Sequence, residues 1–166
     1  MNHKLTQSAV LALLLAAAPA WAQGFGFGVA GVMRTEGSFG QVSGAHGAAG
    51  GGFLIKGIAG PAAEFGAVAN DSNTVVTVAA NGVVHLVPSR ASNPVSPFLT
   101  AGVGMLSDGD SVFAGPSVGA GVDLWAADRF GFRLEVRDII RTDFRNIPEL
   151  RRTAHYWTVR GGIVFR

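Results

Sequence analysis

Charged residues at alternating positions mark the part of this sequence that is best placed to do chemistry. Arg133, Glu135 and Arg137 stand at every second position, with apolar residues between them. Residues two apart on a β-strand point to the same face, so this spacing brings the three charges together. Acids and bases shielded from water pair with one another, because an uncompensated buried charge is costly. We expect a structural ion-pair cluster here, with a proton or ion path as the alternative chemistry.

The histidines do not add a metal or acid–base site. His46, His85 and His155 lack a partner at the two- or four-residue spacing that such sites use. We expect no nucleophile elbow, because the Gly-x-Ser-x-Gly stretch Gly115-Pro116-Ser117-Val118-Gly119 falls within residues 114–125, which we predict to be a strand, and not at a strand-to-helix turn. We therefore expect no catalytic residue, no metal and no cofactor, and we interpret the histidines as residues of strands or of their rims.

The elements that must position the charges are eight stretches in which apolar residues alternate with polar residues or glycine. This period of two is typical of antiparallel strands. Turn-forming residues such as Gly60-Pro61 and Asn70-Asp71-Ser72-Asn73 separate the stretches. The predicted strands are residues 24–36, 48–57, 62–69, 74–87, 97–106, 114–125, 130–141 and 155–165.

A count of nine strands is the competing interpretation. Asn81-Gly82 is a strong signal for a two-residue hairpin turn and would divide the stretch 74–87 into two strands. Single-chain bacterial barrels have an even number of strands, which returns both termini to the same side of the membrane. We therefore predict eight strands, with a glycine inside the fourth.

The strand faces predict a membrane barrel in which apolar residues point outward to lipid and glycines and charges point inward. Strands of eleven residues, tilted by about 40°, span roughly 28 Å, close to the ~25 Å apolar band of outer-membrane barrels. On the first strand we assign Phe25, Phe27, Val29 and Met33 to the lipid and the glycines between them to the lumen. Other glycines assigned to the lumen are Gly102, Gly104, Gly119 and Gly121.

Aromatic residues near strand ends are expected to form girdles at the two membrane interfaces. They are Phe25, Phe27, Phe98, Trp125, Phe130, Phe132, Tyr156, Trp157 and Phe165. Six charged residues fall on the faces that we assign to the lumen, where we expect ion pairs. They are Glu64, Asp123, Arg133, Glu135, Arg137 and Arg160.

The N-terminal residues have the pattern of an export signal. Lys4 precedes an apolar stretch over residues 9–18, and Ala20-Trp21-Ala22 supplies the small residues of a cleavage site. We predict a signal peptide over residues 1–22 and one domain over 23–166. The chain has no cysteine, which excludes a cysteine-linked lipid anchor and disulfides. Its formal net charge of +2 is too small for a nucleic-acid-binding surface.

Three motifs resemble those of the small outer-membrane β-barrel family, the OmpA-like and OmpX-like eight-stranded barrels. They are Pro97-Phe98-Leu99-Thr100-Ala101-Gly102-Val103-Gly104, Gly119-Ala120-Gly121-Val122-Asp123 and Gly131-Phe132-Arg133-Leu134-Glu135-Val136-Arg137-Asp138. The resemblance implies an all-β, up-and-down transmembrane barrel in the bacterial outer membrane. It also implies a last strand that the barrel-assembly machinery recognises, here through Trp157, Val159, Ile163 and Phe165. Arg166 after Phe165 departs from the family's terminal aromatic residue.

We expect a monomeric, non-enzymatic barrel with a role in envelope integrity or surface contacts, in contact with outer-membrane lipid and lipopolysaccharide. The predicted loop 142–154 carries Arg145, Arg151 and Arg152 next to Arg141, and these arginines could pair with lipopolysaccharide phosphates. A lipid-modifying enzyme is one alternative, but the His-x-Ser pair of lipid A deacylases is absent. A soluble periplasmic ligand-binding barrel is the other alternative.

Overall fold

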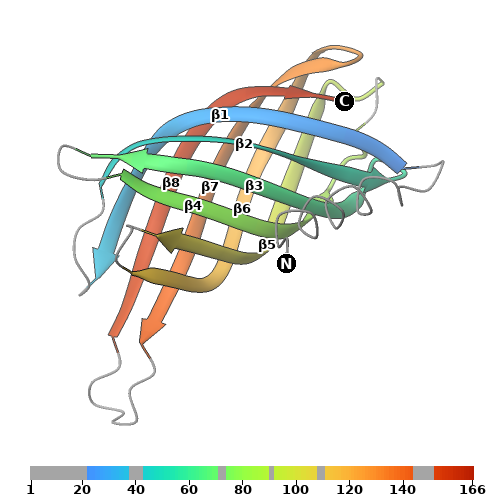
Figure 1. Ribbon diagram of the computed structural model, residues 1–166. Coiled ribbons are helices and arrows are strands. Elements are labelled where there is room, and N and C mark those ends of the chain that lie inside the picture. The colour runs from blue at the N-terminus through green and yellow to red at the C-terminus, as the bar shows by residue number, and fades with distance from the viewer. Residues whose placement is uncertain (1–21, 38–42, 71–73, 90–91, 108–110, 144–151) are drawn as a thin grey trace, which may run out of the picture.

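The computed structural model describes residues 22–37, 43–70, 74–89, 92–107, 111–143 and 152–166. These residues form eight long strands (Figure 1). The strands are β1 (Ala22–Gly37), β2 (Gly44–Ile55), β3 (Ala59–Ala69), β4 (Thr74–His85), β5 (Val95–Ser107), β6 (Val112–Ala127), β7 (Phe130–Asp143) and β8 (Arg152–Phe165). Within the described ranges no helix is long and apolar enough to cross a membrane.

The strands form one closed barrel in which each strand pairs antiparallel with the next along the chain. β1 also pairs with β8, which closes the cylinder. The predicted fold class and the count of eight strands are confirmed. Asn81 lies inside β4, where it pairs with Ala62 on one side and Gly102 on the other, so no hairpin forms at this point.

The strands are staggered around the barrel. A path from strand to strand through paired residues starts at Phe25 of β1 and returns to β1 at Thr35, ten residues further along. Such a stagger accompanies the tilt of about 40° that closing a barrel requires. We call the end where β1 begins and β8 ends the terminal end, and the other the opposite end.

The hairpin between β2 and β3 turns at Lys56-Gly57. Both residues have positive φ, 54° and 71°, as a type I′ turn requires. The backbone nitrogen of Ile58 donates to the carbonyl of Ile55 at 2.9 Å. The sequence-based prediction of a break at Gly60-Pro61 was wrong, since both residues belong to β3. A Cβ at Gly60 would meet the Phe53 carbonyl oxygen, so this glycine permits close strand approach instead of a turn.

Most strands extend beyond their predicted limits. β2 begins at Gly44, four residues before the prediction, and β8 begins at Arg152. β7 continues to Asp143. The connection between β7 and β8 is therefore shorter than the predicted loop 142–154. The predicted signal peptide lies outside the described residues, except for Ala22, which opens β1.

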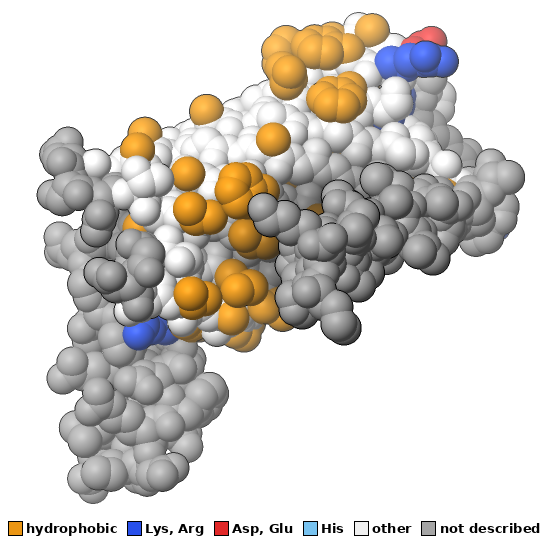
Figure 2. All heavy atoms as spheres, in the orientation of Figure 1, with side chains coloured by type: hydrophobic (Ala, Val, Ile, Leu, Met, Phe, Trp, Pro, Cys, Tyr) orange, Lys and Arg blue, Asp and Glu red, His pale blue; other side chains and the backbone are white. Residues whose placement is uncertain are grey.

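Alternation separates an apolar outer wall from a lumen on β7. Phe132, Leu134 and Val136 point outward, each more than two-fifths exposed, whereas Arg133 on the other face is 2% exposed. Figure 2 shows hydrophobic side chains spread over the outer wall, and the charged side chains visible in this view lie near its ends.

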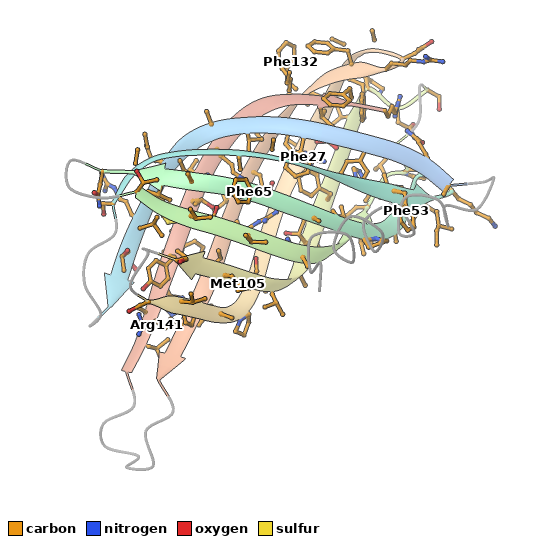
Figure 3. All side chains as sticks on the ribbon, in the orientation of Figure 1. Phe27, Phe53, Phe65, Met105, Phe132 and Arg141 are labelled. Carbon is orange, nitrogen blue, oxygen red and sulfur yellow. The ribbon has the colours of Figure 1, made fainter. Side chains whose placement is uncertain are left out.

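The first strand has the opposite orientation to the one predicted. Phe25, Phe27, Val29 and Met33 are buried in the lumen, and the glycines between them lie on the outer wall. Figure 3 shows Phe27 within the cylinder and Phe132 outside it. Glycines that face the lumen on other strands leave room for these buried side chains. A Cβ at Gly50 would lie 2.7 Å from Cζ of Phe27.

Only some of the residues predicted for the aromatic girdles lie on the outer wall. Phe130, Phe132, Trp157 and Phe165 are exposed on the outer wall. Phe25, Phe27, Phe98, Trp125 and Tyr156 are buried inside the barrel. The lumen glycines Gly102, Gly104, Gly119 and Gly121 occupy the face that was predicted.

Candidate functional site

All six charged residues assigned to the lumen lie there, and all are buried. β3 supplies Glu64, β6 supplies Asp123, and β8 supplies Arg160. β7 supplies the other three, Arg133, Glu135 and Arg137, at alternating positions on its inner face. Strand pairing sets Asp123 opposite Arg133, and Glu135 opposite Arg160. The structure divides the six residues into a ring of four and a separate pair.

Two carboxylates and two guanidinium groups form the four-residue ring. Arg160 places Nη1 2.5 Å and Nη2 2.6 Å from the two carboxylate oxygens of Glu64. Nη2 of Arg160 also donates to Oε2 of Glu135 at 2.9 Å. Nη2 of Arg137 donates to Oε1 of Glu135 at 2.7 Å, and Nη1 lies 3.3 Å from Glu64. Each charge therefore faces two opposite charges.

The ring has no net formal charge, which lowers the energetic cost of burying its four ions. Desolvation of an ion is costly unless opposite charges and hydrogen bonds replace the lost water. Guanidinium groups suit this task because they donate to carboxylates through two parallel N–H groups. The members of the ring come from β3, β7 and β8, so the ring links three strands across the lumen.

Asp123 and Arg133 form the second group, and aromatic rings enclose it. Nε and Nη2 of Arg133 donate to the two carboxylate oxygens of Asp123 at 2.7 and 2.8 Å. The guanidinium carbon lies 4.6 Å from the ring centroid of Phe27 and 4.4 Å from that of Phe98. Phe25 lies further away, at 5.5 Å. Cation–π attraction therefore adds to the single ion pair.

Two of the histidines lie in the lumen, on strands as predicted but not at a rim. Nε2 of His85 is 3.9 Å from Asp123, and Nε2 of His46 is 3.4 Å from Oγ1 of Thr77. These partners come from other strands, so spacing along one strand could not identify them. The described residues contain no group of three or more histidine, cysteine or acidic side chains that could hold a metal.

Apolar side chains fill the lumen on either side of the charges. The cluster toward the terminal end contains Phe25, Phe27, Val29, Leu54, Val83, Phe98, Trp125 and Val164. The cluster toward the opposite end contains Met33, Val68, Val75, Leu106, Ile139, Ala154 and Tyr156. The described interior is thus layered, apolar then ionic then apolar, and its ion pairs are suited to holding strands in place.

The predicted assembly strand points its apolar residues outward. Trp157, Val159, Ile163 and Phe165 are all exposed on the outer face of β8. The terminal Arg166 turns toward the barrel mouth instead. Its guanidinium carbon lies 3.9 Å from the Trp125 ring, and its Nε donates to the carbonyl of Asp128 at 2.8 Å.

The predicted arginine loop is only partly described. Arg145 and Arg151 lie outside the described residues. Arg152 opens β8, and Arg141 belongs to β7, where its guanidinium carbon lies 5.3 Å from the ring centroid of Phe113. These two arginines are therefore strand residues.

One charged contact on the outer wall was not predicted at all. Nδ1 of His155 lies 2.7 Å from Oδ2 of Asp138, and the two residues sit on neighbouring strands. The sequence signal was weak: Asp138 continues the outward series of Phe132, Leu134 and Val136 by period two, as an acid among apolar residues.

Comparison with known proteins identifies the fold. No known protein family and no curated protein matches the sequence. Among solved structures, the chain is similar to Neisserial surface protein A, with a TM-score of 0.66 and 14% sequence identity, over 87% of this chain and 97% of that chain.

Two further solved structures have the same architecture. The N-terminal β-barrel domain of Pseudomonas aeruginosa OprF matches at a TM-score of 0.58 and 12% identity, over 86% of this chain and 98% of that one. Ail, the attachment invasion locus protein of Yersinia pestis, matches at 0.50 and 13% identity, over 86% and 99%; it was solved with the heparin analogue sucrose octasulfate. The chain therefore has the fold of the eight-stranded outer-membrane barrels.

Proposed function

We propose that this chain is a non-enzymatic barrel of the bacterial outer membrane, with a structural or surface-contact role in the cell envelope. The observation that carries the proposal is the polarity of the wall. Ion pairs occupy the middle of the lumen, and exposed valine, leucine and phenylalanine residues cover the outside. In water such a surface would expose a large apolar area, whereas in a bilayer lipid covers it.

A soluble ligand-binding barrel requires the reverse polarity, with a polar exterior around an apolar cavity. Outward residues such as Leu134 at 54% and Val159 at 58% exposure do not suit that alternative. Fractionation separates the two hypotheses. We expect the native protein in the outer-membrane fraction, released only by detergent, and a protein released by osmotic shock would contradict the proposal.

Heat-modifiability tests barrel closure in that fraction. A closed barrel whose backbone groups are all paired resists detergent until it is boiled, so unboiled and boiled samples should migrate differently on a gel. Identical migration of the two samples would argue against a closed membrane barrel.

The filled lumen supports a role other than that of a porin. An eight-stranded barrel is only just wide enough for its own side chains, and here apolar clusters flank the ion pairs. We expect no stable single-channel current in planar bilayers from the wild-type protein. A current that Glu135→Gln abolishes would favour the alternative of an ion path.

The absence of enzymatic activity is part of the proposal and has its own test. We expect the mass spectrum of lipid A to be unchanged when the protein is overproduced, and a loss or gain of an acyl chain would overturn this part. We further propose that the barrel is monomeric, that barrel-assembly machinery recognises Trp157, Val159, Ile163 and Phe165, and that lipopolysaccharide contacts the barrel from outside.

A further inference from the structure

A buried carboxylate interrupts the apolar outer wall. Asp138 follows Phe132, Leu134 and Val136 on the outward face of β7, yet its side chain is only 4% exposed. Its Oδ1 has no hydrogen-bond partner within the described ranges. A charged residue on a lipid-facing wall is costly and usually serves a function. Asp138 is therefore a candidate for a functional role and not only a structural one.

His155 provides a contact that gives the carboxylate a use. Its Nδ1 lies 2.7 Å from Oδ2 of Asp138, and its side chain is 39% exposed. A carboxylate at one ring nitrogen of histidine fixes the orientation of the ring and directs the other nitrogen to a ligand. Asp138 thus acts as a positioning residue, and Nε2 of His155 is the nitrogen available to an outside group.

An aromatic ring extends the same surface. The rings of His155 and Trp157 are stacked, with centroids 6.2 Å apart and planes inclined by 17°. Trp157 is 41% exposed. The two rings therefore lie nearly parallel to each other on the outer face of β8.

β1 places charges of both signs beside the rings of His155 and Trp157. In the register of β1 and β8, Arg34 is paired with Trp157 and Glu36 with His155. Arg34 and Glu36 are exposed and share the outward face of Val32. We call Arg34, Glu36, Asp138, His155 and Trp157 together the outer platform.

The outer platform lies at the edge of the apolar band. Along β8 the outward residues from Trp157 to Phe165 are apolar or glycine, and His155 is the first polar one toward the opposite end. In a barrel with both termini on the inner side of the membrane, this edge meets the headgroups of the outer leaflet. The ligand chemistry should therefore be that of a headgroup.

The mixture of groups favours a sugar over a simple anion. Aromatic faces pack against the C–H groups of a sugar ring, Glu36 and Nε2 of His155 can accept from hydroxyls, and Arg34 can donate to oxygen or phosphate. The two carboxylates within the outer platform, Glu36 and Asp138, disfavour the binding of a phosphate alone, because like charges repel.

We propose that the outer platform binds the sugar headgroup of a glycolipid in the outer leaflet. The proposal rests on the membrane location proposed above and adds a ligand class and a place on the wall. Asp138 orients the ring of His155 so that Nε2 can form a hydrogen bond with the sugar. The rings of His155 and Trp157 pack against the sugar, and Arg34 contacts an oxygen or phosphate at the edge of the headgroup.

The test uses the fluorescence of Trp157 in vesicles of defined composition. Trp125→Phe in the chain from residue 23 onward leaves Trp157 as the one tryptophan. Four lipids are titrated into phosphatidylcholine vesicles: further phosphatidylcholine, phosphatidylglycerol with a phosphate only, a galactolipid with a sugar only, and lipid A with both. We expect saturable changes with the galactolipid and lipid A. Equal changes with phosphatidylglycerol and lipid A would overturn the proposal.

Variants then test the assigned residues, with co-purified lipid A measured by native mass spectrometry as a second readout. We expect Arg34→Ala and His155→Gln each to weaken lipid A binding about tenfold, roughly the loss of one good hydrogen bond to a charged group. Arg129→Ala is the matched control, since Arg129 is an exposed arginine at the terminal end. Equal binding by Arg34→Ala and Arg129→Ala would contradict the assignment.

Asp138→Asn separates positioning from direct contact. It keeps the size of the side chain but removes the charge that orients His155, so binding should fall while Trp157 remains exposed to quenchers. Heat-modifiability of every variant distinguishes the two proposals. Variants that remain heat-modifiable but bind lipid A like the wild type overturn only the glycolipid site, whereas loss of the mobility shift in the wild type overturns the membrane barrel.

Discussion

The two ionic groups of the lumen compensate their buried charges in different ways. In the ring of Glu64, Glu135, Arg137 and Arg160, each charge faces two opposite charges. Asp123 instead depends on Arg133, with His85 further away at 3.9 Å. The ring is protected by redundancy, and the pair is protected by phenylalanine rings that enclose the guanidinium.

This contrast determines which buried charge is most sensitive to the loss of its partner. Removing one partner of an isolated pair leaves the other charge without compensation, whereas a member of a network keeps part of its stabilisation. Substitutions in the two groups should therefore differ in cost, although both groups are equally shielded from water.

The largest expected effect is at Arg133. Arg133→Met leaves Asp123 buried beside phenylalanine rings, so the free energy of unfolding should fall by about 3–5 kcal/mol. Urea titration of the barrel in vesicles, followed by gel mobility, measures the loss. Asp123→Asn combined with Arg133→Met should recover most of it, and a double variant as unstable as the single one would contradict the pair model.

A smaller loss is expected in the ring. Arg160→Met leaves Arg137 in contact with both Glu64 and Glu135, so we expect the free energy of unfolding to fall by roughly 2 kcal/mol under the same conditions. A loss as large as that of Arg133→Met would show that redundancy gives no protection.

The aromatic enclosure should contribute less than either ion pair. Phe27→Leu removes one ring beside Arg133 and should cost about 1–2 kcal/mol in the same titration. Phe132→Leu is the matched control, because that ring lies on the outer wall at 51% exposure. Equal costs at the two positions would mean that the guanidinium gains nothing from the ring.

The smallest effect is expected at the terminal arginine, outside both groups. Arg166→Ala removes the cation–π contact with Trp125 and should cost about 0.5–1 kcal/mol. The local readout is the emission maximum of Trp125 in a Trp157→Phe background, which should shift to longer wavelength as water reaches the ring. An unchanged emission spectrum would contradict the contact.

Period two predicted the strand count and which residues of a strand share a side, and the charges and glycines assigned to the lumen on β3, β5, β6, β7 and β8 lie there. Alternation by itself does not show which of the two faces of a strand points into the lumen. On β1 the choice depended on space, since Gly50 of β2 makes room for the ring of Phe27 in the lumen. In the same way, Gly121 of β6 makes room for the ring of Phe98 on β5. That complementarity joins residues on different strands, and a single strand contains no sign of it.

The candidate site followed the same pattern. Alternation assigned the six lumen charges, but the division into a ring and a pair depends on the register between β3, β7 and β8. The contact of His155 with Asp138 depends in the same way on the pairing of β7 with β8. Spacing along the chain shows neither register, which is why the histidine was interpreted as a strand or rim residue without a partner.

The closed ring of eight paired strands limits how this protein can change. Deleting one strand would leave two rows of unpaired backbone groups, and hydrocarbon offers them no substitute for the lost hydrogen bonds. It would also move the C-terminus to the other side of the bilayer. The chain can therefore lengthen or shorten only by whole hairpins if its two ends are to stay on the same side.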